Sequence, residues 1–201
     1  MLDLKAVLLI AFVSLPVLAL PTSSSSGPPG FNITSLTYAG NACPPGSTEF
    51  FVSNDRSAIT GVFSDFFAET GPSVDPTLNN RSCQVSLNVH VPVGYRFSAA
   101  NIAYNGLVDL GDEVVANFFA TYSLEGRKAS AYSPYTGPVS SGSGSHYRRT
   151  DEFDFDAQTT CGGDVVLYVE PSLKVDNTAI PSESALLTAD TIDLNLFWRK
   201  C

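Results

Sequence analysis

The chain has 201 residues, of which 44% are hydrophobic and 15% are charged, and its formal net charge at pH 7 is −9. This composition is that of a globular protein and excludes collagen-like, coiled-coil and strongly disordered chains. With 11 basic against 20 acidic residues, the chain lacks the excess positive charge that binding to a phosphate backbone requires, so no nucleic-acid partner is expected.

Residues 1–19 have the pattern of a secretory signal peptide. Lys5 precedes an apolar run over residues 6–15, Pro16 ends that run, and Ala19 supplies the small residue expected before the cleaved bond. An uncleaved anchor is the alternative, but the run is short for the roughly 20 apolar residues of a membrane span. No later segment is long and apolar enough to span a bilayer. We therefore expect a secreted, extracellular protein.

The next segment, residues 20–35, contains the run PTSSSSGPPG. A low-complexity stretch of this kind has nothing to bury, so it is predicted to be a disordered linker. Residues 36–201 are then expected to form a single domain.

Beyond the linker, strand periodicity recurs and helical periodicity is almost absent. Apolar and polar residues alternate over 83–91, 165–169 and 192–198, as in strands with one buried face. Gly, Pro and Asn residues, including Asn105-Gly106, punctuate the chain as turn signals. The pattern predicts an all-β fold, an antiparallel β-sandwich or jelly-roll-like domain of about eight to ten strands. Further strands are predicted at 48–53, 58–67, 95–104, 113–124 and 150–156.

The four cysteines, Cys43, Cys83, Cys161 and Cys201, predict two disulfides in a secreted chain. Three connectivities are possible, and we favour Cys43–Cys83 with Cys161–Cys201 because the shorter loops close at lower entropic cost. A zinc site is the rival interpretation, but no two cysteines have the C-x-x-C spacing of such sites.

Two sequons, at Asn32 and Asn80, become candidate N-glycosylation sites once the chain is exported. Asn80 lies in the polar stretch 76–82, which is expected to be an exposed loop. A sugar on Asn80 would keep that face out of any buried interface.

Several short motifs are distributed along the predicted domain. They are GNACPPG at 40–46, FSDF at 63–66, Gly71-Pro72, NRSC at 80–83, VPVGY at 91–95, YNG at 104–106, Gly137-Pro138, Cys161-Gly162 and WRKC at 198–201. Together they resemble one family of small secreted proteins, domain of unknown function 4360. The resemblance covers about residues 36–201 and implies a secreted, disulfide-bonded, β-rich domain with no assigned chemistry. It supplies no catalytic residue.

Catalytic and cofactor motifs are missing from the sequence. It contains no G-x-S-x-G, H-E-x-x-H, P-loop or G-x-G-x-x-G pattern, so we expect no enzymatic activity and no cofactor. His90 is predicted to face outward from its strand, and His146 follows a Ser/Gly run that is a poor support for a catalytic base.

Glu152, Asp154 and Asp156 alternate with two phenylalanines, which would place the three acids on one face of a strand. A solvated outer face is the preferred interpretation. A calcium ion or another cation, and an acid/base pair for glycoside hydrolysis, are the alternatives.

Residues 127–149 form the most distinctive surface candidate. Tyr132, Tyr135 and Tyr147 are candidate binding residues, because exposed tyrosines stack on sugar rings or anchor protein contacts. The alternative is a strand followed by a plain turn. Arg148-Arg149 also has the form of a dibasic processing site, although ordinary surface arginines are the simpler interpretation.

The sequence thus predicts a secreted, monomeric, non-catalytic protein of the extracellular space or cell wall. Its partner is expected to be an extracellular protein or a cell-surface molecule, and action as an effector on another organism is one such role. A carbohydrate-binding module is the alternative function, and a carboxylate-dependent glycan-active enzyme is a more distant one.

Overall fold

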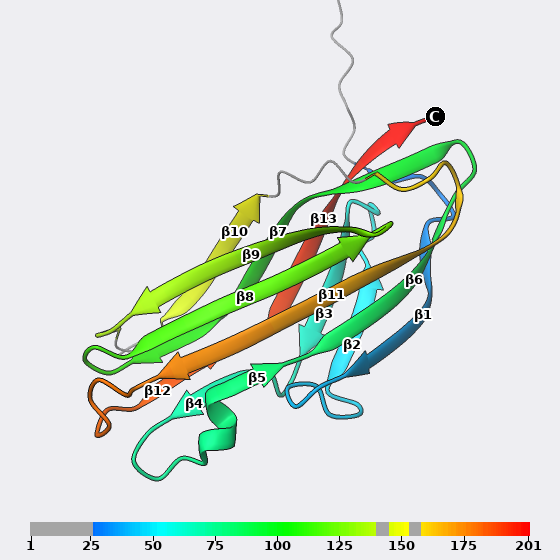
Figure 1. The fold of residues 1–201 in the computed structure, drawn as a ribbon. Coiled ribbons are helices and arrows are strands. Elements are labelled where there is room, and N and C mark those ends of the chain that lie inside the picture. Colours follow the sequence, from blue (N-terminus) through cyan, green and yellow to red (C-terminus); the bar gives the residue numbers. More distant parts are fainter. Residues whose placement is uncertain (1–25, 140–144, 153–157) are drawn as a thin grey trace, which may run out of the picture.

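The strand periodicity of the sequence is realised as two antiparallel sheets packed face to face (Figure 1). The computed structural model describes residues 26–139, 145–152 and 158–201. The expected signal peptide lies outside the described residues. Within them, the one helix is the 3-10 turn η1 (Pro76–Asn79), and no helix is long and apolar enough to cross a membrane.

The first sheet has six strands in the order β1-β6-β11-β8-β9, with β5 pairing β11 beside this path. Every pairing is antiparallel. Its strands are β1 (Asn32–Ala39), β5 (Asn80–Ser82), β6 (Gln84–Val91), β8 (Val115–Leu124), β9 (Arg127–Thr136) and β11 (Gly163–Asp176).

The second sheet has seven strands in the order β2-β3-β13-β7-β12-β4, with β10 pairing β7. All of these pairings are antiparallel as well. Its strands are β2 (Thr48–Val52), β3 (Ala58–Phe63), β4 (Phe67–Thr70), β7 (Tyr95–Leu110), β10 (His146–Glu152), β12 (Ala185–Thr188) and β13 (Thr191–Lys200).

The core lies between the sheets, where the predicted apolar positions meet. Leu87 of β6, Leu167 of β11 and Phe118 of β8 are fully buried from the first sheet, and Ile102 of β7 and Leu194 of β13 face them from the second. The all-β sandwich is therefore confirmed. The described residues contain thirteen strands rather than eight to ten, because the edge strand β1 and the short strands β5 and β12 lack clear alternation.

The two disulfides join Cys43 to Cys83 and Cys161 to Cys201, with Cα atoms 5.5 and 6.2 Å apart. These are the predicted pairs, which were favoured because they close the shorter loops. The first is buried and ties the segment after β1 to the start of β6. The second joins the segment before β11 to the last residue of the chain.

The structure corrects the boundary of the expected linker. β1 begins at Asn32, inside the range 20–35 that the composition assigned to disordered chain. Phe31 is 4% exposed and its ring lies 4.8 Å from that of Trp198. The apolar Phe31 therefore anchors the start of the domain against the second sheet.

The Asn105-Gly106 pair is not a turn, because β7 continues through it to Leu110. A Cβ added at Gly106 would lie 2.2 Å from the carbonyl oxygen of Thr188. The glycine therefore allows a close approach between β7 and the end of β12. The predicted strand over 58–67 is in turn divided, since β3 ends at Phe63 and β4 begins at Phe67.

Candidate functional site

The outer face of the six-stranded sheet is the solvent-facing set of side chains on β1, β5, β6, β11, β8 and β9. Burial alternates strictly along β6, where Val85 and Leu87 point to the core and Gln84 and Ser86 point to solvent. The same alternation runs through β11 and β8. Since paired residues of neighbouring strands share a face, the register places outward side chains in rows that cross the sheet.

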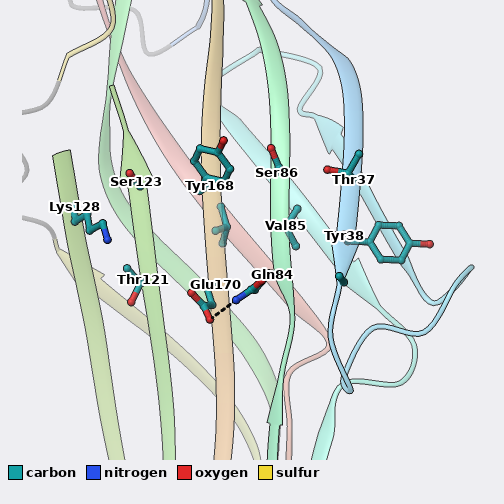
Figure 2. A pocket seen from close by; sticks show the side chains of 12 residues that line it. Thr37, Tyr38, Gln84, Val85, Ser86, Thr121, Ser123, Lys128, Tyr168 and Glu170 are labelled. Carbon is teal, nitrogen blue, oxygen red and sulfur yellow. Dashed lines mark hydrogen bonds between the residues drawn. The ribbon is translucent and has the colours of Figure 1, made fainter. Parts of the chain in front are cut away.

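Two adjacent rows lie at the middle of this outer face (Figure 2). We call them the Tyr168 row and the Glu170 row. The Tyr168 row contains Thr37, Ser86, Tyr168, Ser123 and Lys128, one residue from each of β1, β6, β11, β8 and β9. The Glu170 row contains Ala39, Gln84, Glu170 and Thr121.

These rows line a groove with a volume of about 580 Å³. Tyr168 is 54% exposed, so its ring presents a broad apolar surface in the groove. Beside it, the Gln84 Nε2 group donates a hydrogen bond of 3.1 Å to Glu170 Oε1. Among the described residues, the hydroxyls of Ser86 and Ser123 have no hydrogen-bonding partner in the protein. They are available to a ligand.

An apolar extension borders the groove on β8 and β9. Phe119 is 40% exposed and pairs with Tyr132, which is 57% exposed. The Tyr132 hydroxyl donates to Asn117 Oδ1 at 2.6 Å, and Val115 continues the extension at 38% exposure. Of the three tyrosines predicted to be binding residues, Tyr132 is therefore the one on the open outer face.

Tyr135 and Tyr147 were expected on an exposed loop, and here the structure is different. Both lie on strands and pack against the core between β9 and β10, with ring centroids 5.4 Å apart. The Tyr147 hydroxyl donates to the Thr188 carbonyl oxygen at 2.6 Å. Burial raises the pKa of both tyrosines. Their rings cover the side of the sandwich and do not form an open binding surface.

A buried polar cluster lies beside these two rings. The Tyr104 hydroxyl contacts Ser133 Oγ and donates to Asp151 Oδ2 at 2.7 Å, and Ser133 Oγ donates to the same carboxylate oxygen at 3.1 Å. Burial raises the pKa of Tyr104 above its usual range, so its hydroxyl stays protonated and donates. Tyr104 and Ser133 are 0% exposed. The cluster therefore links β7, β9 and β10 out of reach of a ligand.

The predicted acidic triad is only partly described. Glu152 is exposed at the end of β10, while Asp154 and Asp156 lie outside the described residues. Across the part of the chain that is described, no group of three or more His, Cys, Asp or Glu side chains is placed to hold a metal ion. This holds for a second hollow too, of about 570 Å³, whose lining includes Glu69, Asp109, Asp112 and Glu183.

The two histidines lie on opposite sheets. His90 faces the outer face as predicted, and its Nδ1 lies 2.8 Å from Asp164 Oδ1. His146 is exposed at the start of β10. Arg148 and Arg149 follow it on the same strand, and their backbones are paired with Asn105 and Tyr104 of β7.

Both sequons lie on the outer face. Asn32 of β1 is exposed beside His90, and Asn80 of β5 is exposed beside Lys174 of β11. Asn80 was expected in a loop, but it begins a short strand directly after η1.

Sequence reasoning missed the groove itself. Tyr168 belongs to a strand that was recognised only by its inward residues, and Thr37 belongs to an edge strand that was not predicted. The outward positions of the predicted strands were the available signal, but their alignment requires the register.

Comparison with solved structures gives distant likenesses. One is the structure of TmCBM61 in complex with β-1,4-galactotriose, with a TM-score of 0.31, 10% identity and coverage of 84% of this chain and 90% of the other. Another is the enzymatically active domain of tailspike protein 4 of bacteriophage CBA120, with a TM-score of 0.22, 9% identity and coverage of 83% and 19%. At these TM-scores neither likeness bears on the function.

Sequence comparison is more informative. An uncharacterized secreted protein of Arthroderma benhamiae is 26% identical over 196 residues, which cover 90% of this chain and 78% of the relative. A secreted relative and two disulfides agree with the N-terminal pattern, and the protein is secreted. The family model of domain of unknown function (DUF4360) matches residues 29–201, so the chain belongs to this family.

Proposed function

We propose that the protein is a non-catalytic extracellular binding protein that recognises a glycan through the groove on its outer face. The observation that carries the proposal is the exposed ring of Tyr168 surrounded by hydroxyl, amide and carboxylate groups. A sugar ring has apolar C–H faces that stack on an aromatic ring and hydroxyls at its edge that need donors and acceptors. Tyrosine suits such a contact because one part of it is apolar and the other polar.

The polar groups of the groove can both donate hydrogen bonds to a sugar hydroxyl and accept them from it. Ser86, Ser123 and Thr121 each supply one donor and two acceptor lone pairs, and the Gln84–Glu170 pair adds amide protons and carboxylate oxygens. Because these groups stand beside the Tyr168 ring, a ligand can stack and form hydrogen bonds at once.

The proposal contains no catalytic step. Glu170 is the one carboxylate among the described residues that line the groove, and glycoside hydrolysis ordinarily requires two carboxyl groups on either side of the bond. We expect glycans to be bound and released unchanged, and a reducing-sugar assay with the wild-type protein tests this.

The binding test is retention of the oxidised protein on insoluble chitin, β-1,3-glucan and cellulose. We expect at least one of the three to retain the wild-type protein and Tyr168→Ala to weaken the retention by about tenfold. Phe197→Ala is the matched control, because Phe197 is 47% exposed on the other sheet and should bind as wild type. Absence of retention on all three materials would overturn the proposal.

A protein partner is the second candidate function. The observation that favours it is the apolar extension of Phe119, Tyr132 and Val115 at the edge of the groove, since exposed apolar groups of this kind mark interaction surfaces. The test is binding to purified extracellular proteins. Phe119→Ala should abolish such binding, and Phe51→Ala, which changes an exposed aromatic residue of β2, should preserve it.

A further inference from the structure

The two central rows also fix the direction in which a ligand would lie. The Tyr168 row takes one side chain from each of five neighbouring strands. Strands in a sheet are about 4.8 Å apart, so the row extends over about 19 Å at right angles to the strands. The Glu170 row is two residues farther along β11, which is about 7 Å. The two rows therefore form an elongated strip that crosses the sheet, which we call the channel.

Tyr168 is at the centre of this channel. Its strand, β11, is the third of the five, with β6 and β1 on one side and β8 and β9 on the other. Thr37 and Lys128 mark the two ends (Figure 2). A single sugar stacked on Tyr168 would leave both ends empty, whereas an extended chain would reach both.

The charges of the channel are balanced. Among the described lining residues, Lys128 is the one cation and Glu170 the one anion, and Glu170 already accepts a hydrogen bond from Gln84. The whole chain has a formal charge of −9, which repels an acidic polymer at long range. These charges favour an uncharged chain over an acidic polysaccharide.

The two sequons stand on either side of the channel along the strand direction. Asn32 is aligned with Asp164, two rows before Tyr168, and Asn80 is aligned with Lys174, two rows after Glu170. Each distance is about 13 Å. Sugars at these positions would crowd a protein interface of standard size, about 800 Å² on each partner. They would leave a slender ligand free to lie between them.

We infer, on the basis of the proposed function, that the ligand is an extended, uncharged oligosaccharide that lies across the five strands and stacks on Tyr168 at its midpoint.

The test is a length series measured by isothermal titration calorimetry. The probes are chitin and β-1,3-glucan oligosaccharides from one to six sugars, with oligogalacturonate as the acidic comparison. We expect affinity to rise with length until the oligosaccharide spans the channel and then to level off. We expect the acidic series to bind more weakly than the neutral one.

Variants at the ends of the channel test its direction. Lys128→Ala and Thr37→Ala each remove one polar contact, so they should weaken the longest neutral oligomer roughly 2- to 10-fold and leave the shortest binding oligomer unchanged. Tyr168→Ala should weaken every length. Lys174→Ala and Asn117→Ala, on the outer face but outside both rows, are the matched controls and should have no effect.

The outcomes separate the two proposals. If no oligosaccharide of either series binds, the proposed glycan function fails, and the inference fails with it. If glycans bind with an affinity that is independent of length, or if the acidic series binds better, the glycan function stands and the extended, uncharged ligand is refuted. Equal effects of Lys128→Ala on short and long oligomers would also refute it.

Discussion

The two disulfides offer a controlled measurement of how cross-links stabilise this fold. Both join residues separated by 40 positions, and the two loops do not overlap. In the chain-entropy description, closing a loop of this length removes about 13 cal/mol/K from the unfolded chain, which is about 4 kcal/mol at 25 °C. Each disulfide should therefore contribute about 4 kcal/mol to the free energy of unfolding.

The two disulfides differ in burial, and this difference predicts which of them contributes more to the free energy of unfolding. Cys43 and Cys83 are 2% and 0% exposed, whereas Cys161 and Cys201 are exposed. Replacing the first pair by alanine leaves a small cavity in addition to the lost cross-link, for a further 1–2 kcal/mol or so. The variant C43A/C83A should thus lose about 5–6 kcal/mol and C161A/C201A about 4 kcal/mol.

The assay is equilibrium unfolding in urea, followed by far-UV circular dichroism and by the fluorescence of the single tryptophan, Trp198. Because the loops are separate, the two losses should add. Their sum is comparable to the 5–15 kcal/mol stability of a typical domain, so the variant without disulfides should be largely unfolded. A loss below about 1 kcal/mol for either pair, with the other disulfide intact by mass spectrometry, would refute the reasoning.

Three further predictions concern other parts of the molecule. Tyr104→Phe removes a hydrogen bond to the Asp151 carboxylate and should lower the free energy of unfolding by about 1.5–3 kcal/mol, whereas Tyr168→Phe should not change it; equal urea midpoints for the two variants would contradict this. The pKa of Asp55 is lowered from 3.8 to about 2 by hydrogen bonds from Ser53 and Ser57, so its stabilisation is complete above about pH 4 and is lost as the pH falls towards 2. Asp55→Asn should therefore flatten the acid decline of stability over that range, and an unchanged profile would exclude the effect. Arg148 and Arg149 lie in the backbone pairing of β10 with β7, so the native protein should resist dibasic-specific proteases until it is unfolded; rapid cleavage of native protein, seen by mass spectrometry, would show that β10 opens.

The predictable parts of the fold are those in which local pattern and burial agree. β6, β11 and β13 alternate because one face of each lies on the core, so period-two hydrophobicity identified them. β1 is an edge strand with few buried side chains, and β12 has four residues. Neither has enough alternation to stand out from a loop.

Two errors arose because tertiary contacts override local preference. Asn-Gly is a strong hairpin signal, but in β7 the glycine is needed for the close approach to Thr188. Tyr135 precedes and Tyr147 follows the turn-like residues from Gly137 to Ser145, which suggested that both are exposed. Their rings instead fill the space between β9 and β10, a contact between strands whose proximity the sequence does not reveal.

The groove depends on the register more strictly than any other feature, and the core sets that register. Tyr168 faces the groove because its neighbours Leu167 and Val169 are buried opposite Leu87 and Val85. A shift of β11 by one residue would bury Tyr168 and expose Leu167. The apolar side chains between the sheets therefore align the hydroxyls and the ring on the outer face. The alignment of the Tyr168 row and the Glu170 row is set by the core packing, and any variant that keeps this packing should keep the groove.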